Sequence, residues 1–147
     1  MKGERRMYKA LDIANYVVTK CTKDECPISN LQLQKILYYI QRYYLVHRDI
    51  PAFSDEIEAW QFGPVVPDVY RHFCGFGAMK INAVFEELCI KDADRKVIDI
   101  VVNAKKNLSP WDLVNDTHRE GKAWSIIFKN GEGLYQTIPT ELIRING

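Results

Sequence analysis

Apolar residues recur every three to four positions in several segments of the chain, a spacing typical of amphipathic helices. From Tyr8 onward this spacing predicts a first helix, which ends before the polar segment 22–27. Ser29 and Gln32 have the spacing of a capping box, so a long second helix is expected over about residues 30–47. Because apolar side chains fall on two sides of that helix, we expect neighbours to pack against both.

Shorter elements follow the second helix. Alternation of residue types over 56–62 predicts a short strand, and the segment from Gly63 to Pro67 is expected to form a rigid turn. Proline and capping signals then predict helices from Pro67 to the Gly75–Gly77 stop, over 80–88, from Asp92 or Asp94 onward, from Ser109 to about His118, around 124–128 and after Pro139. The expected fold class is mainly α. It is a single compact domain over residues 1–147, with about six to seven helices around the long central helix and a small β element at 56–62.

Composition narrows the classes of protein to which the chain can belong. Its 147 residues are 47% hydrophobic and 27% charged, as in ordinary globular domains, and its net charge of +1 supplies no field for nucleic acid or anionic membranes. We therefore expect no membrane partner, no nucleic-acid partner and a cytoplasmic location. Residues 1–6 carry Lys2, Arg5 and Arg6 and are expected to form a flexible, solvated arm, although such an arm could also contact phosphate.

Candidate chemistry in the chain is sparse. Its four cysteines match neither a zinc-site spacing nor a Cys-x-x-Cys redox pair, so no metal and no cofactor are expected. His118, beside Glu120, could serve as a general base, but no serine or cysteine in the local sequence completes a catalytic pair. We expect His118 to be hydrogen-bonded within the fold, near Trp60 or Tyr70. Asp55, Glu56 and Glu58 form an acidic segment that could meet a basic surface.

Three sequence blocks carry a family resemblance. The first is Ile28-Ser-Asn-Leu-Gln-Leu-Gln-Lys-Ile-Leu-Tyr-Tyr-Ile-Gln41, the second is Ile57-Glu-Ala-Trp-Gln-Phe-Gly-Pro-Val-Val-Pro-Asp-Val-Tyr70, and the third runs from Leu108-Ser109 through Thr117-His118 to Trp124. In order and spacing they resemble the Panacea domain family of SocA-like antitoxins, which includes phage-associated GepA-like proteins. Two positions depart from the family pattern. Ile36 stands where leucine is usual. The third block reads Gly-Lys-Ala-Trp, whereas proline commonly precedes the tryptophan in the family.

The resemblance implies that the protein is a non-enzymatic antitoxin that binds and neutralises a protein toxin encoded beside it. It also implies motif residues, which we expect to be structural: Leu33, Lys35, Leu37, Trp60, Gly63, Pro64, Val65, Tyr70, Thr117, His118 and Trp124. The partner surface should be built from exposed side chains. On the second helix we expect five residues to face the toxin: Gln34, Tyr38, Tyr39, Gln41 and Arg42.

Two alternatives to direct neutralisation stay open. One family member acts as an adaptor that delivers its toxin to a cytosolic protease, and this chain could do the same. The other is a cryptic hydrolase or metal-dependent enzyme that uses His118. The sequence does not identify the toxin, its binding surface or the oligomeric state.

Overall fold

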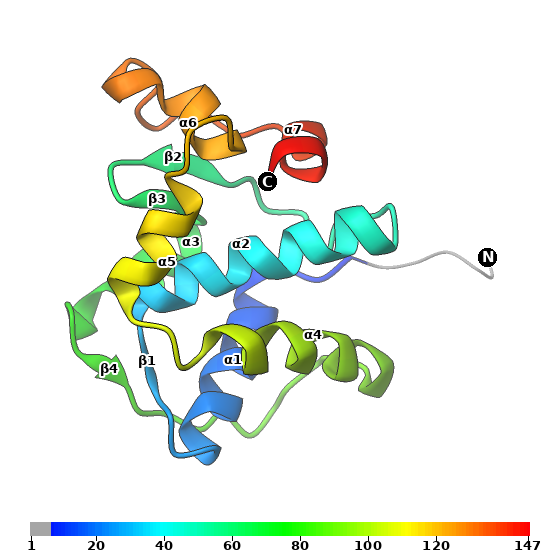
Figure 1. Cartoon of the computed structure of the whole chain (residues 1–147). Helices are drawn as coiled ribbons and strands as arrows, with labels where there is room; N and C mark the ends of the chain where they lie inside the picture. The colour runs from blue at the N-terminus through cyan, green and yellow to red at the C-terminus, as the bar shows by residue number, and fades with distance from the viewer. Residues whose placement is uncertain (1–6) are drawn as a thin grey trace.

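The structure is a computed structural model that describes residues 7–147, so the expected N-terminal arm at 1–6 lies outside the described residues. Within 7–147 the chain is mainly helical, which confirms the predicted fold class (Figure 1). The α-helices are α1 (Ala10–Lys23), α2 (Asn30–His47), α3 (Pro67–Phe73), α4 (Asp92–Lys105), α5 (Pro110–Thr117), α6 (Ala123–Phe128) and α7 (Thr140–Asn146). The short strands are β1 (Ile28–Ser29), β2 (Glu58–Trp60), β3 (Gly63–Val65) and β4 (Lys80–Ile81).

Helix α2 lies at the centre of the molecule and begins where the capping box predicts. The Gln32 N–H donates to Ser29 Oγ over 3.2 Å, and the Ser29 N–H donates to Gln32 Oε1 over 2.9 Å. Helices α1, α4, α5 and α7 and the β2–β3 hairpin all pack against α2 (Figure 1). Leu33 and Tyr38 lie about 140° apart around the axis of α2 at about 100° per residue, and both are buried, which confirms that the helix is enclosed by neighbours.

The strand predicted at 56–62 is present but shorter, since β2 covers only Glu58–Trp60. The rigid turn expected from Gly63 onward is wrong. Gly63–Val65 is a strand that pairs antiparallel to β2, with Trp60 opposite Gly63 and Glu58 opposite Val65. The Gly63–Pro64 pair is typical of a turn. Proline has no N–H to donate to a neighbouring strand, but it is tolerated in an edge strand such as β3. The hairpin places Gly63 and Pro64 against α2.

The helix expected over 80–88 is also wrong. Lys80–Ile81 form β4, which pairs with β1 through Ile28 opposite Ile81, and no helix follows until Asp92. Ile81 is fully buried by this pairing, so a distant partner outweighs the weak local helix pattern. The cap expected at Asp92 or Asp94 is not made by those side chains, since Asp94 is buried and accepts the hydroxyl of Tyr44 over 2.7 Å.

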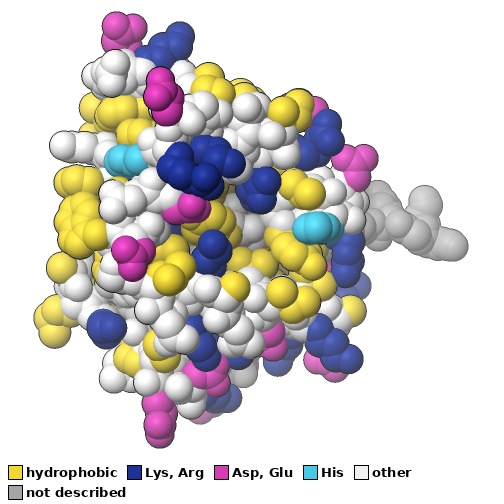
Figure 2. Space-filling model, in the orientation of Figure 1, with side chains coloured by type: hydrophobic (Ala, Val, Ile, Leu, Met, Phe, Trp, Pro, Cys, Tyr) yellow, Lys and Arg dark blue, Asp and Glu magenta, His cyan; other side chains and the backbone are white. Residues whose placement is uncertain are grey.

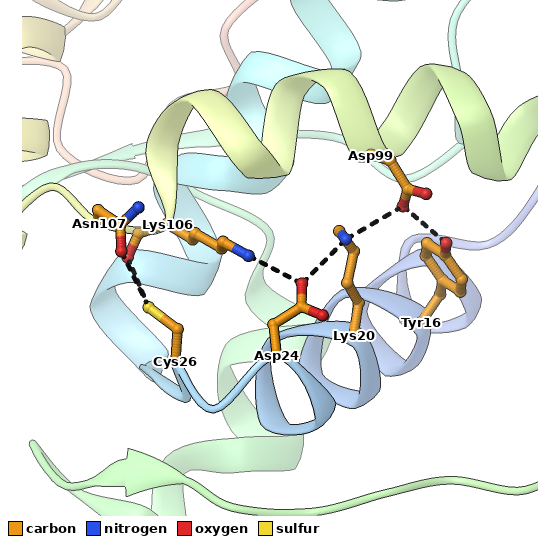
Figure 3. A network of polar contacts seen from close by, with 7 residues as sticks. All are labelled: Tyr16, Lys20, Asp24, Cys26, Asp99, Lys106 and Asn107. Carbon is orange, nitrogen blue, oxygen red and sulfur yellow. Dashed lines mark hydrogen bonds and ion pairs between the residues drawn. The ribbon is translucent and has the colours of Figure 1, made fainter.

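A polar network joins the end of α1 to α4 (Figure 3). The Asp24 carboxylate lies 2.8 Å from Lys106 Nζ and 2.9 Å from Lys20 Nζ, and the Tyr16 hydroxyl donates to Asp99 Oδ1 over 2.6 Å. These contacts hold the two helices together at the edge of the core. No helix in the described part of the chain is long and apolar enough to span a membrane.

Candidate functional site

Two of the motif blocks meet at a buried lysine. Lys35, on α2, is fully buried and donates a hydrogen bond from Nζ to the carbonyl oxygen of Pro64 over 2.9 Å. Burial without a carboxylate partner lowers the pKa of Lys35 to about 7, because the charged form loses its hydration. The motif lysine therefore fixes the β2–β3 hairpin against α2.

Gly63 is required where the hairpin touches this lysine. Its φ of +115° lies in the left-handed region, and a Cβ placed there would lie 2.7 Å from Lys35 Cε and 3.0 Å from Thr117 Oγ1. The first distance is shorter than real Cβ atoms show, and the second is tighter than most real Cβ contacts. The third motif block also reaches this point, since Thr117 sits at the end of α5 and donates its hydroxyl to the Val114 carbonyl over 2.9 Å. All three blocks thus build one buried cluster from α2, β3 and α5.

The motif tryptophans lock the hairpin to α6. Trp124 Nε1 donates to the Trp60 carbonyl over 2.8 Å, and the Trp60 ring meets that of Tyr70 edge-on with centroids 5.1 Å apart. His118 stacks on Trp124, with centroids 3.7 Å apart and rings 4° from parallel. His118 is hydrogen-bonded within the fold near Trp60, as expected, because it makes a hydrogen bond to the backbone of Phe62. Its Nε2 is buried and has no partner among the described residues.

His118 has the environment of a packing residue. Burial lowers its pKa, the nearby positive charge of Lys35 adds to the effect, and the backbone of Phe62 opposes it. Both main causes favour the neutral imidazole. A neutral ring that covers the indole of Trp124 accounts for the position of His118 in the motif. In residues 7–147 no three His, Cys, Asp or Glu side chains are grouped so that they could hold a metal ion.

A groove opens beside this buried cluster, where α2, α4 and α5 meet. Its volume is about 510 Å³, within the range of ligand-binding clefts. Its lining residues are Tyr38, Tyr39, Arg42, Tyr43, His47, Ile100, Val101, Ala104, Lys105, Asp116, Thr117, Arg119, Lys122 and Gly147. Figure 2 shows a few Lys and Arg side chains near the middle of this face, with hydrophobic and acidic side chains between them. Thr117 belongs to both the buried cluster and the groove wall.

Tyr39 is the centre of the polar contacts in the groove. Its hydroxyl donates a short hydrogen bond to Asp116 Oδ2, and Lys105 Nζ lies 4.2 Å from the centroid of its ring. Burial and this bond to Asp116 both raise the pKa of Tyr39 far above its usual value. Arg119 also pairs with Asp116, with 3.1 Å between Nη2 and Oδ1. Tyr39 thus ties α2 to both α4 and α5.

Three of the five predicted partner-facing residues are not exposed. Gln34, Tyr38 and Gln41 are each buried to within 2% of complete. Gln34 Oε1 accepts the Val66 N–H over 2.9 Å, and Gln41 Oε1 accepts the Ala52 N–H over 2.7 Å. Because these amides satisfy backbone groups of neighbouring loops, the expectation that they face solvent is wrong. Only Tyr39 and Arg42 are partly exposed.

Residues 33–125 match the family described as "Antitoxin SocA-like, Panacea domain". The chain belongs to this family. Among curated proteins it is similar to Antitoxin SocA of Caulobacter vibrioides strain NA1000 / CB15N, with 34% identity over 133 residues that cover 82% of this chain and 70% of that protein. No solved structure matches the chain. The assigned role is that of an antitoxin, as the sequence predicted.

The matched range contains both the buried motif cluster and most of the groove. It begins at Leu33, includes Lys35 and the hairpin, and ends one residue after Trp124. The buried cluster joins α2, the hairpin and α5, and Thr117 of that cluster also lines the groove.

The acidic segment is engaged within the fold. Asp55 Oδ1 accepts the Ala10 N–H over 2.8 Å and so satisfies the start of α1, while Glu58 Oε1 accepts Trp60 Nε1 over 2.9 Å. Glu56 lies outside β2, and its Oε1 accepts the Thr137 hydroxyl over 2.8 Å. These bonds give the segment a structural role.

Sequence reasoning missed most of the groove. Arg119 and Lys122 lie in the turn between α5 and α6, and Ile100 lies on α4. They carry no spacing signal that connects them with Tyr39, because they are distant from it along the chain. The signal that could have led to the groove is the partly exposed Tyr39–Arg42 pair at helical spacing (i, i+3).

Proposed function

We propose that this protein is an antitoxin that neutralises a protein toxin encoded beside it by direct, stoichiometric binding through the groove between α2, α4 and α5. Membership of the SocA-like antitoxin family supports the role. The observation that carries the binding mode is the groove itself, which Tyr39 and Arg42 both line. Tyrosine and arginine are the residue types most enriched at the energetic centres of protein interfaces.

The groove also has the rigidity that an interface needs. Tyr39 is fixed by Asp116 and Lys105 before any partner arrives, and Asp116 is fixed in turn by Arg119. Side chains that are ordered in the free protein lose less conformational entropy on binding. A preformed wall of this kind favours occlusion of the toxin without a large rearrangement of the antitoxin.

The test is co-expression with the product of the adjacent gene. Growth rescue is scored first, and the complex is then purified from the same cells. Arg42→Ala should weaken the complex by about tenfold or more, as for an interface hot spot. Arg71→Ala is the matched control, because this arginine is exposed on α3 and lies outside the groove.

The outcomes separate the alternatives. Rescue with a stable complex supports direct binding. Two results together indicate the adaptor mechanism and overturn occlusion. Growth is rescued although no complex is found, and the toxin stays active in a purified mixture that lacks protease and ATP. Toxicity without rescue overturns the antitoxin proposal for this pair.

A further inference from the structure

The groove concentrates positive charge in a protein that is nearly neutral overall. The groove is lined by four basic side chains: Arg42, Lys105, Arg119 and Lys122. Among the described residues, Asp116 supplies the only carboxylate side chain in the groove. The whole chain has 20 basic and 19 acidic residues. This groove is therefore a local excess, and not part of a generally basic surface.

The one carboxylate of the groove is already engaged. Asp116 accepts the Tyr39 hydroxyl and pairs with Arg119. The remaining three cations, Arg42, Lys105 and Lys122, make no ion pair with any residue in 7–147. Apart from Asp116, no carboxylate side chain of residues 7–147 lines the groove to balance these three basic side chains.

Each of these three cations has hydrogen-bonding capacity left. Lys122 Nζ donates only a long bond of 3.3 Å to the Gly147 carbonyl, and Lys105 Nζ rests over the Tyr39 ring. Arg42 Nε is buried and has no acceptor within the described residues. A buried N–H without an acceptor is costly, and a guanidinium presents paired donors that fit a carboxylate. Arg42 as a whole is partly exposed, so its guanidinium can pair with an anionic group that enters the groove.

We propose that the groove binds an acidic segment of the partner protein, with an Asp or Glu carboxylate paired to Arg42 and further acidic side chains facing Lys105 and Lys122. This proposal rests on the proposed antitoxin function and names the chemistry of the toxin surface that the groove takes. Charge complementarity of this kind selects partners and speeds association.

The walls of the groove favour a peptide over a nucleic acid. Between the cations lie Tyr43 and Ile100, and the latter is 57% exposed although it is apolar. Apolar contact beside fixed charges suits the mixed side chains of a protein segment, whereas a nucleic-acid site is expected to follow a phosphate backbone along a broader basic surface. A volume of about 510 Å³ holds a few side chains at once.

The decisive experiment measures the affinity of the purified antitoxin for its co-encoded toxin over a range of salt concentrations. The double variant Lys105→Glu, Lys122→Glu reverses two groove charges. The control, Lys23→Glu with Lys80→Glu, makes the same change in net charge at exposed sites away from the groove. Lys23 and Lys105 each lie in the last turn of a 14-residue helix, so the helix-end effects match. Circular dichroism melting establishes that each variant is folded.

We expect the groove variant to bind the toxin at least tenfold more weakly than the wild type and with a shallower dependence on salt, while the control stays within about twofold. Arg42→Gln, which removes charge without reversing it, should weaken binding in the same direction. Hydrogen exchange of the toxin in the complex should protect a segment rich in Asp and Glu.

Other results overturn the proposal in distinguishable ways. If the groove variant forms the complex as tightly as the wild type, the acidic-segment proposal is wrong and the antitoxin function stands. If no complex forms even with the wild type, both fail together. If a single-stranded oligodeoxythymidine binds the wild type and loses affinity in the groove variant, while toxin binding is unchanged, the groove is a nucleic-acid site.

Discussion

The ammonium group of Lys35 donates its hydrogen bond to Pro64, the one residue of the β2–β3 hairpin that has no N–H of its own. The two residues are 29 positions apart in the chain, and their contact places the hairpin on the central helix. Together with the bond from the Val66 N–H to Gln34 Oε1, it connects the first two sequence motifs. It also buries a basic group without a carboxylate, which makes the cluster sensitive to pH.

Lys35→Met should change how stability depends on pH. In the folded protein burial lowers the pKa of Lys35 from 10.5 to about 7. Between these values the unfolded chain binds the proton and the folded chain does not, so raising the pH favours the folded state. The free energy of unfolding of the wild type, relative to Lys35→Met, should rise from pH 7 toward pH 10 by at most about 1.4 kcal/mol per pH unit. Urea unfolding at several pH values measures it, and a constant difference would show that Lys35 keeps an ordinary pKa.

Gly63→Ala should destabilise the protein by about 2–4 kcal/mol, because it combines a strained φ with a clash against Lys35. Gly121→Ala is the matched control. That glycine also has a positive φ, of +84°, but nothing lies within 4 Å of the position of its Cβ. It should cost only the backbone strain, about 1–2 kcal/mol. Equal losses in urea unfolding would mean that the close approach to Lys35 has no energetic weight.

His118→Ala should lower stability by about 1–3 kcal/mol through loss of the stack on Trp124. We expect the variant to rescue growth like the wild type when both are assayed at a temperature where the variant is folded. A metal analysis of the purified wild type accompanies the growth assay. A folded variant that cannot rescue, or a stoichiometric bound metal, would support an enzymatic role for His118.

Asp24→Asn should loosen the junction of α1 and α4 by no more than about 1 kcal/mol, since the pair is partly exposed to solvent. Hydrogen bonds from Lys106 and Lys20 lower the pKa of Asp24. Its contribution is thus complete above the ordinary carboxyl pKa and is lost as the pH falls through the lowered value. Thermal melting should show a difference from wild type at pH 7 that shrinks in 1 M salt. Asp68→Asn, at a largely exposed pair on α3, should show none.

Local signals in the sequence predict most helices well. They fail where the secondary structure of a segment depends on a residue that is distant in the chain. The capping box of Ser29 and Gln32 sets the start of α2, and Ser109 with Pro110 sets the start of α5, because both act within one helical turn. Ile81 is different. Its strand forms because Ile28 lies opposite it across more than 50 positions of chain, and no periodicity near residue 81 contains that information.

The candidate site divides in the same way. The sequence by itself determined the family, the antitoxin role and the motif residues, because Lys35, Gly63 and Trp124 stand at recognisable spacings. Tertiary structure alone decided that Gln34 and Gln41 turn inward to satisfy loop backbone groups, and that Tyr39 and Arg42 meet basic residues of α4 and of the turn after α5 in one groove. The physical reason is that burial and charge clustering depend on which elements pack together, whereas helix capping and periodicity depend only on neighbours along the chain.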